Sequence, residues 1–195
     1  STYETPDGDD IENVNDARDK AFSEWCEVCD VNGQYTFAEI QAMAQREIVE
    51  AGEVLIRKIN TPRNDHRGIY RSVPFALELI EADRLAIDKD NQGPRNKIGD
   101  NRIVRGVEVD DLGKPVAYWV YPDHPRQVYS FNRTAERIPA SQILHLFRRD
   151  RIGQTRGVSW FAPAASWLRD LGVYVDNELQ ASAVASCFTA FIKSD

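Results

Sequence analysis

The apolar positions at the start of the chain recur every three or four places, the spacing that puts them on one face of a helix. Between residues 10 and 29 they lie among charged residues at this spacing and predict a first helix. This helix is expected to end at the turn Asp30-Val31-Asn32-Gly33. Thr36 and Glu39 have the spacing of a capping box, in which a hydroxyl and a carboxylate each accept a hydrogen bond from a backbone N–H that has no partner within the helix. The segment Phe37–Glu50 is therefore predicted to be a second helix.

Beyond Gly52 the apolar residues come in short, branched runs bounded by Gly, Pro, Asp and Asn, as is typical of β-strands. The clearest hairpin is predicted at residues 103–121, where two alternating runs flank the turn Asp110–Lys114. Residues 81–85 predict a short helical turn, and the polar residues 88–101 predict a surface loop. The predicted strands are Glu53–Ile59, Val73–Ile80, Ile103–Val109, Val116–Tyr121, Gln127–Phe131 and Ile143–Phe147.

The last part of the chain contains one long predicted helix, Ser159–Ile192, which Ser159 can cap and in which Pro163 is tolerated in the first turn. At a rise of about 1.5 Å per residue, roughly 30 residues make a rod of about 45 Å, longer than a compact domain of this size needs. Its apolar stripe consists of Leu168, Leu171, Val175, Leu179, Val184 and Phe188. We expect the first part of this stripe to pack on the preceding domain. The small side chains of Ala181, Ala185 and Ala190 would let another helix approach closely.

This order of elements predicts an α+β fold rather than a doubly wound sheet. Two N-terminal helices precede a mixed or antiparallel sheet domain, and one long C-terminal helix follows it. We expect an α+β domain at residues 1–158 and the long helix at residues 159–195.

The charge of the chain limits the partners that it can bind tightly. The 195 residues include 24 basic and 31 acidic side chains, which give a net charge of −7. Affinity for nucleic acid depends mainly on neutralising phosphates, so we expect at most weak, non-specific and salt-dependent binding of double-stranded DNA. No apolar run approaches the ~20 residues that span a bilayer, and the polar start Ser1–Asp10 is expected to be neither a signal peptide nor an anchor. A membrane is therefore not expected as a partner.

The cysteines give a first candidate for metal or redox chemistry. Cys26, Cys29 and Cys187 are an odd number, which favours a reducing compartment over a disulfide framework. Cys26 and Cys29 have the C-x-x-C spacing of zinc and redox sites, but a structural zinc site needs four ligands and the sequence contains no second pair. We interpret them as ordinary thiols at a helix end and expect no bound metal.

The histidines are interpreted as structural residues. His66, His124 and His145 are scattered, and His145 lies in an otherwise apolar strand, where a hydrogen-bonded and partly buried ring is expected. The sequence has neither a nucleophile elbow nor a glycine-rich phosphate loop. We therefore predict that the protein is not an enzyme and uses no cofactor.

The loop that follows the last predicted strand contains the one basic cluster of the chain, Arg148, Arg149, Arg151 and Arg156. Two interpretations stay open. In the first, this is a solvated loop that Asp150 and more distant carboxylates partly neutralise. In the second, the arginines contact an acidic neighbouring subunit or DNA.

The strand ending in His145-Leu146-Phe147 runs into Gly153-Gln154-Thr155-Arg156-Gly157 and then into the long helix. This arrangement resembles the lambda-type bacteriophage portal family, in which a His-hydrophobic-Phe triplet precedes a G-Q-x-R-G turn and a long helix. Further similar stretches, in the order of the family, are Gly52-Glu53-Val54-Leu55, Glu81-Ala82-Asp83-Arg84-Leu85, Gly106–Asp110 with Gly113, and Ala117-Tyr118. The two glycines of the turn are expected to let the chain reverse with a positive φ. Arg156 is placed to reach carbonyls or carboxylates across the turn.

The resemblance implies a structural subunit of a cyclic homo-oligomer, twelve-fold in the family, found in the virion of a phage or prophage and assembled in the host cytoplasm. Such a ring forms the passage for double-stranded DNA and the docking site for terminase, scaffold, capsid and head-completion (head-tail connector) proteins. Residues 1–158 would be the wing domain, and the long helix would be the descending stem helix. By the same resemblance residues 1–195 lack the clip and the second stem helix, so these residues alone are expected to be mostly monomeric.

Two other classes of protein stay open. One is a stand-alone α+β adaptor that binds another protein through its small-residue helix, and a monomeric full-length protein would favour it. The other is a hydrolase, which convergent acids or histidines with strongly perturbed pKa values in a deep pocket would favour.

Overall fold

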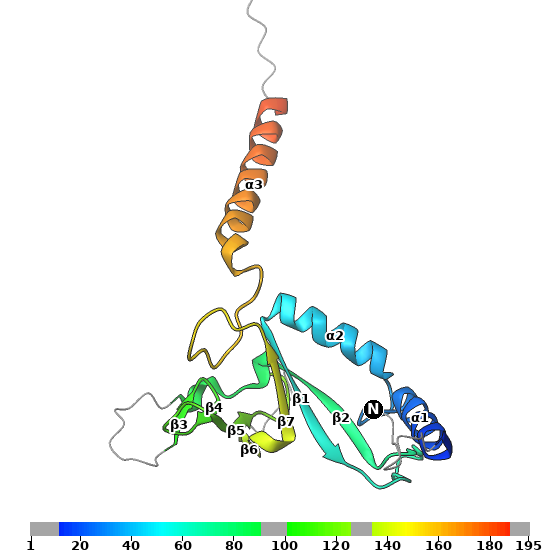
Figure 1. The fold of residues 1–195 in the computed structure, drawn as a ribbon. Coiled ribbons are helices and arrows are strands. Elements are labelled where there is room, and N and C mark those ends of the chain that lie inside the picture. Colours follow the sequence, from blue (N-terminus) through cyan, green and yellow to red (C-terminus); the bar gives the residue numbers. More distant parts are fainter. Residues whose placement is uncertain (1–11, 91–100, 126–133, 188–195) are drawn as a thin grey trace, which may run out of the picture. The chain divides into compact units, whose positions relative to one another are not determined.

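The computed structural model of the chain describes residues 12–90, 101–125 and 134–187. The chain divides into two compact units, residues 1–159 and residues 160–195. The elements confirm the predicted α+β class, with two N-terminal helices, sheets of antiparallel strands and a long C-terminal helix (Figure 1).

Both predicted N-terminal helices are confirmed, as α1 (Glu12–Glu27) and α2 (Phe37–Glu50). The capping box is also present, because the Thr36 hydroxyl accepts the Glu39 N–H at 3.3 Å while the Glu39 carboxylate accepts the Thr36 N–H at 2.8 Å. Between the helices, the Asp30 carboxylate accepts the N–H groups of Asn32 and Gln34 at 3.1 and 3.2 Å. These bonds form the predicted turn.

The first sheet has the strand order β2-β1-β7, with β1 (Glu53–Asn60), β2 (Phe75–Glu81) and β7 (Ile143–Phe147) all antiparallel. Val54 on the central strand pairs with Glu81 on one side and with Leu146 on the other. The first half of β1 is buried on both faces, which explains its near-continuous apolar sequence.

The second sheet has the order β3-β4-β5-β6, with β3 (Arg102–Val104), β4 (Val107–Val109), β5 (Pro115–Val120) and β6 (Glu136–Pro139). The prediction of one strand over Ile103–Val109 is wrong, because the chain turns back at Arg105 and Gly106. Their φ angles of 48° and 85° lie in the left-handed region, as a two-residue type I′ hairpin requires. An arginine at the first position hides this turn from a sequence pattern, since asparagine or aspartate is usual there.

One further predicted strand is not tested, and one observed strand was not predicted. The predicted strand Gln127–Phe131 falls within residues 126–133, which lie outside the described residues. β6 was not predicted, because Ile138 is its one buried residue and charged residues and a proline surround it. The predicted turn at residues 81–85 is confirmed as the 3₁₀ helix η1 (Ala82–Arg84), and a second one, η2 (Ile87–Lys89), follows it.

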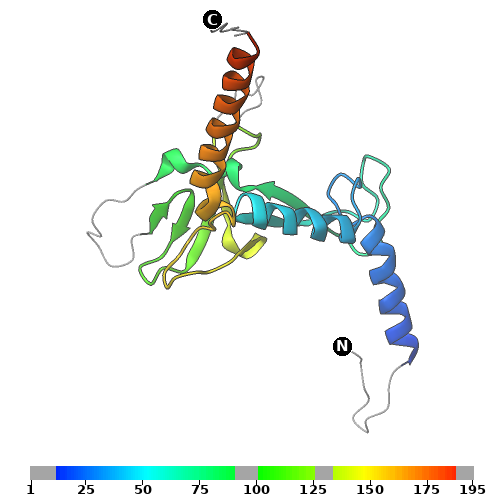
Figure 2. The same ribbon diagram turned by 90° about the horizontal axis from the view of Figure 1, so that it is seen from above.

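The core of the first unit has two parts, one on each face of the β2-β1-β7 sheet. On one face α2 packs across β1 and β2 (Figure 2), and Trp25, Ile40 and Val54 are among the buried residues there. On the other face Leu55 and Ile80 pack against Val107, Tyr118 and Ile138 of the second sheet. Each fully buried side chain of this kind stabilises the fold by about 1.5–3 kcal/mol.

The second unit begins with a 3₁₀ turn, η4 (Ala162–Ala164), and continues as α3 (Ala165–Cys187). The helix starts later than predicted: Ser159 does not cap it, and its hydroxyl instead donates to the Val49 carbonyl at 3.4 Å within the first unit. Pro163 occupies the first turn, where its missing N–H has no cost. No residue of α3 is buried, and Leu168 and Leu171 are more than half exposed. The packing of this stripe on the preceding domain stays a prediction.

Candidate functional site

The candidate site lies in the first unit, where β7 runs into the loop 148–157. Gln154 holds this loop in shape: its side-chain oxygen accepts the Asp150 N–H at 2.8 Å, and its side-chain nitrogen donates to the Arg156 carbonyl at 2.8 Å. Gly153 has a φ of 75°, so the positive φ expected there is confirmed. The G-Q-T-R-G sequence is thus a loop closed by its own glutamine, a role that the sequence reasoning missed.

A buried carboxylate anchors the end of this loop to the sheet. Glu53, the first residue of β1, is 2% exposed, and its Oε2 atom accepts the N–H of Gly157 at 2.7 Å. Its Oε1 atom accepts a hydrogen bond from Nε of Arg156 at 2.5 Å. Arg156 also donates to the Arg105 carbonyl at 2.6 Å, so its guanidinium joins β1, the 148–157 loop and the β3–β4 turn. This confirms the expectation that Arg156 reaches carbonyls or carboxylates across the turn.

His145 provides the third contact of the buried carboxylate. Its Nε2 atom lies 2.8 Å from Oε2 of Glu53, and its Nδ1 atom lies 3.4 Å from the Tyr118 hydroxyl. Because an ionised carboxylate only accepts, Nε2 must bear the proton of this bond. The ring is thus hydrogen-bonded and partly buried, as its position in an apolar strand predicted.

The electrostatics of this network keep Glu53 charged. Burial raises the pKa of Glu53, but the hydrogen bond from His145, the positive charge of Arg156 and the Gly157 N–H together hold it below its usual value. Burial, and then the negative charge of Glu53, raise the pKa of Tyr118 to about 12. At neutral pH the site therefore contains a carboxylate and a protonated phenol, both in structural contacts. A carboxylate held in this way is a poor proton acceptor.

The two backbones at this anchor approach so closely that neither position has room for a side chain. A Cβ atom at Gly157 would lie 2.1 Å from the Gly52 carbonyl oxygen, and one at Gly52 would lie 2.3 Å from the Val158 carbonyl carbon. Gly157 itself does not have a positive φ, so the expectation for this second glycine is wrong. The reason for glycine there is the close approach of the chain to the start of β1.

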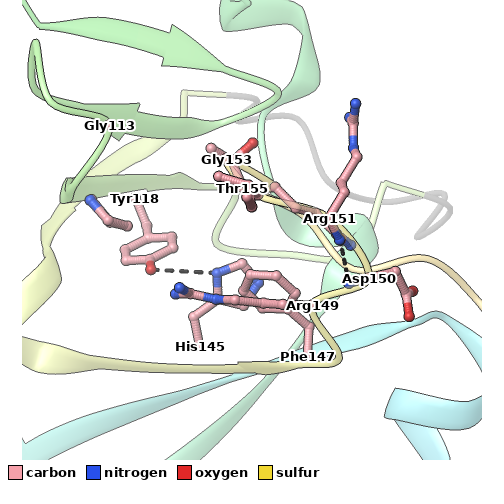
Figure 3. A pocket seen from close by; sticks show the side chains of 12 residues that line it. Gly113, Tyr118, His145, Phe147, Arg149, Asp150, Arg151, Gly153 and Thr155 are labelled. Carbon is pink, nitrogen blue, oxygen red and sulfur yellow. Dashed lines mark hydrogen bonds between the residues drawn. The ribbon is translucent and has the colours of Figure 1, made fainter.

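Beside the anchor the loop encloses a cavity of about 650 Å³ (Figure 3), which we call the basic cavity. It is lined by Gly113, Pro115, Tyr118, His145, Phe147, Arg149, Asp150, Arg151, Ile152, Gly153, Gln154 and Thr155. The guanidinium carbon of Arg149 lies 5.5 Å from the centre of the Phe147 ring, and the His145 and Phe147 rings are 4.5 Å apart. The rings of His145 and Phe147 therefore form an aromatic wall, and the solvent-exposed guanidinium of Arg149 lies against it.

The predicted basic cluster divides into three parts. Arg148 pairs with Asp150 at 2.7 Å on the surface, and Arg156 is bound to Glu53. Arg149 and Arg151 are exposed, line the basic cavity and make no ion pair within the described part of the chain. Whether any of the four contacts DNA or a neighbouring subunit stays a prediction. Of the predicted helix-packing residues, Ala181 and Ala185 lie on α3, and Ala190 lies outside the described residues.

The remaining candidates from the sequence were the cysteines, a metal site and a membrane-spanning segment. Cys26, Cys29 and Cys187 are free thiols, and burial and the neighbouring Cys26 raise the pKa of Cys29 to about 11. Within residues 12–90, 101–125 and 134–187, no three His, Cys, Asp or Glu side chains are grouped so that they could hold a metal ion. Over the same residues, no helix has the length and apolar character needed to cross a membrane.

Residues 2–195 match the family described as phage portal protein, lambda family. The chain belongs to this family. A probable portal protein of Halomonas phage phiHAP-1 is 31% identical over 187 residues, which cover 91% of the chain and 33% of that relative. The portal protein B of Escherichia phage lambda is 28% identical over 119 residues, or 57% of the chain and 22% of the relative. The portal protein of Escherichia phage N15 is 29% identical over 107 residues, or 51% and 20%.

The chain thus spans a third or less of the length of these portal proteins. Three of the residues through which it resembles the family come together in space, although they are far apart in the sequence. Glu53 of the G-E strand, His145 of the triplet and Arg156 of the turn form one hydrogen-bonded network. In this portal-family chain the shared motif therefore forms a structural anchor.

Proposed function

We propose that the chain is part of a structural subunit of a phage or prophage portal ring. The observation that carries this is the family match over residues 2–195, and the Glu53 anchor built from the family's motif residues supports it. In this proposal the ring is a closed homo-oligomer of twelve subunits. It is a component of the virion and assembles in the cytoplasm of the bacterial host.

Within this proposal the first unit is the wing domain, and α3 is the beginning of the descending stem helix. The exposed apolar side chains of α3, such as Leu171 and Leu179, need a partner in the assembled protein. Ala181 and Ala185 lie four residues apart on this helix and would let a neighbouring helix approach closely. A second stem helix or the α3 of an adjacent subunit would fill this place.

The proposed role is mechanical and does not involve catalysis. The ring provides a passage for double-stranded DNA at the capsid vertex. It also provides a docking site for terminase, scaffold, capsid and head-completion proteins. The net charge of −7 supports a passage that DNA crosses without binding tightly, because only a net basic surface would neutralise many phosphates.

Electron microscopy of the full-length subunit that contains this sequence tests the proposal. A closed ring with an axial channel wide enough for duplex DNA, with α3 in its wall, is expected. A full-length protein that stays monomeric at high concentration would contradict the portal role and favour a stand-alone adaptor. Submicromolar, sequence-selective DNA binding at physiological salt would contradict the proposed passage.

A further inference from the structure

The two edges of the β2-β1-β7 sheet carry surfaces of opposite charge. β7 forms one edge, and the basic cavity opens beside it. β2 forms the other edge, beside a groove of about 670 Å³ whose acidic and basic lining residues are Asp30, Arg46, Glu47, Glu78, Glu81, Arg84, Asp123 and His124. We call this second surface the acidic groove.

The basic cavity presents two cations that no carboxylate of the described chain neutralises. Arg148 and Arg156, the other two arginines of the loop, already pair with Asp150 and Glu53. Arg149 is held against the aromatic wall, 5.5 Å above the Phe147 ring. An arginine resting on aromatic side chains beside a cavity is typical of the anchor residues of protein interfaces.

The complementary charge lies at the acidic groove, which Glu81 lines, and at Asp83, which lies next to the groove beside its lining residue His124. The side chains of Glu81 and Asp83 are 56% and 68% exposed, and one imidazole, His124, lies 3.6 and 3.5 Å from them. Burial, and then the charge of Glu81, raise the pKa of the nearby Glu47, with Asp83 adding to the effect. The carboxylates are thus crowded enough to repel one another. A cation from outside the chain would relieve that repulsion.

We propose that the basic cavity of one copy of this chain binds the acidic groove of a second copy, with Arg149 and Arg151 facing Glu81 in the groove and Asp83 next to it. The proposal rests on the proposed ring. Because the two surfaces differ and lie at opposite edges of one sheet, the contact is head-to-tail. Repetition of such a contact closes a ring when the rotation per subunit divides the circle, whereas a two-fold dimer would need one self-complementary surface.

A DNA backbone is the other polyanion that two arginines could contact, and the observations favour it less. Two guanidinium groups would neutralise few phosphates, and the carboxylates elsewhere on a chain of net charge −7 would repel the rest of the duplex. A second copy, in contrast, brings a preformed set of carboxylates.

The test is a charge exchange in the full-length subunit, followed by native mass spectrometry at a fixed protein concentration. Arg149→Glu alone and Asp83→Arg alone should each weaken ring assembly by about tenfold or more, since each sets like charges against one another. The double variant Arg149→Glu with Asp83→Arg should regain assembly, because every interface then contains an exchanged pair. Lys20→Glu and Glu24→Arg, both on exposed positions of α1, are the matched controls and should assemble normally.

Each outcome bears on the proposal. Loss in both single variants with recovery in the double variant supports it. Normal assembly of the single variants overturns it and leaves the proposed ring intact, as does loss without recovery when circular dichroism shows native folding. If Arg149→Glu assembles normally but lowers DNA binding and its salt dependence, the cavity contacts DNA and the proposal is wrong. If the wild-type subunit forms no ring, the proposed function fails and this inference fails with it.

Discussion

The carboxylate of Glu53, at the first position of β1, lies 2.8 Å from Nε2 of His145, which is 92 residues away in the sequence. This contact joins the central strand of the first sheet to its edge strand at the point where the 148–157 loop begins. Arg156 and the Gly157 N–H, at the other end of the loop, donate hydrogen bonds to the same carboxylate. Motif residues that are far apart in the sequence thus fix the 148–157 loop to the sheet, just before the first unit ends.

Replacing Glu53 by glutamine is expected to lower the free energy of unfolding of the first unit by about 3 kcal/mol, because it removes one partner of a buried ion pair. The amide keeps the volume of the side chain but leaves the Arg156 guanidinium without its counter-charge. Urea denaturation followed by tryptophan fluorescence measures the change. Glu50→Gln, at an exposed position three residues earlier, is the control and should change stability little. Equal effects of the two substitutions would show that the buried pair contributes nothing.

The same carboxylate predicts a pH dependence. The pKa of Glu53 is lower in the folded chain than its ordinary value of 4.5, so the unfolded chain takes up the proton first as the pH falls. The stability due to Glu53 is fully present above that ordinary value and is lost as the pH drops through the lower folded pKa. The stability difference between wild type and Glu53→Gln should therefore shrink below about pH 4.5. A difference that stays constant down to the acid unfolding limit would contradict the assigned direction of the pKa shift.

Alanine in place of Gly157 should destabilise the first unit by about 2 kcal/mol or more, because a Cβ atom there would overlap the Gly52 carbonyl oxygen. Thermal unfolding followed by circular dichroism measures the loss. Gly172→Ala on α3 is the matched substitution, since a Cβ atom there meets nothing within 4 Å. It should leave the first unit unchanged and raise the helicity of α3. Unchanged stability of Gly157→Ala would rule out the close approach.

The turn at Arg105 and Gly106 predicts a stabilising substitution. A non-glycine residue with a φ of 48° is strained, and asparagine tolerates this region better than arginine. Arg105→Asn should raise the free energy of unfolding by about 0.5–1 kcal/mol. The Arg156 contact should survive, because Arg105 accepts it through its backbone carbonyl. Lower stability of this variant than of wild type, measured by urea denaturation, would contradict the type I′ assignment.

The sequence predicted those parts of the fold that local patterns determine. The Thr36 and Glu39 capping box and the bounds of α2 depend on residues that are neighbours in the sequence, and both were confirmed. The Arg105 turn was missed, because its residue type is unusual for its conformation. The Glu53, His145 and Arg156 network could not be derived from spacing, since strand pairing in the fold brings these residues together. The resemblance identified all three motifs, but their shared carboxylate is visible only in the structure.

The mass of the assembled full-length subunit, measured by native mass spectrometry, tests the central claim most directly. The portal assignment predicts a closed ring of twelve subunits, whereas residues 1–195 alone should stay mostly monomeric. A full-length protein that remains monomeric at high concentration would contradict the account, and a stable ring formed by residues 1–195 alone would contradict the expected need for the rest of the subunit.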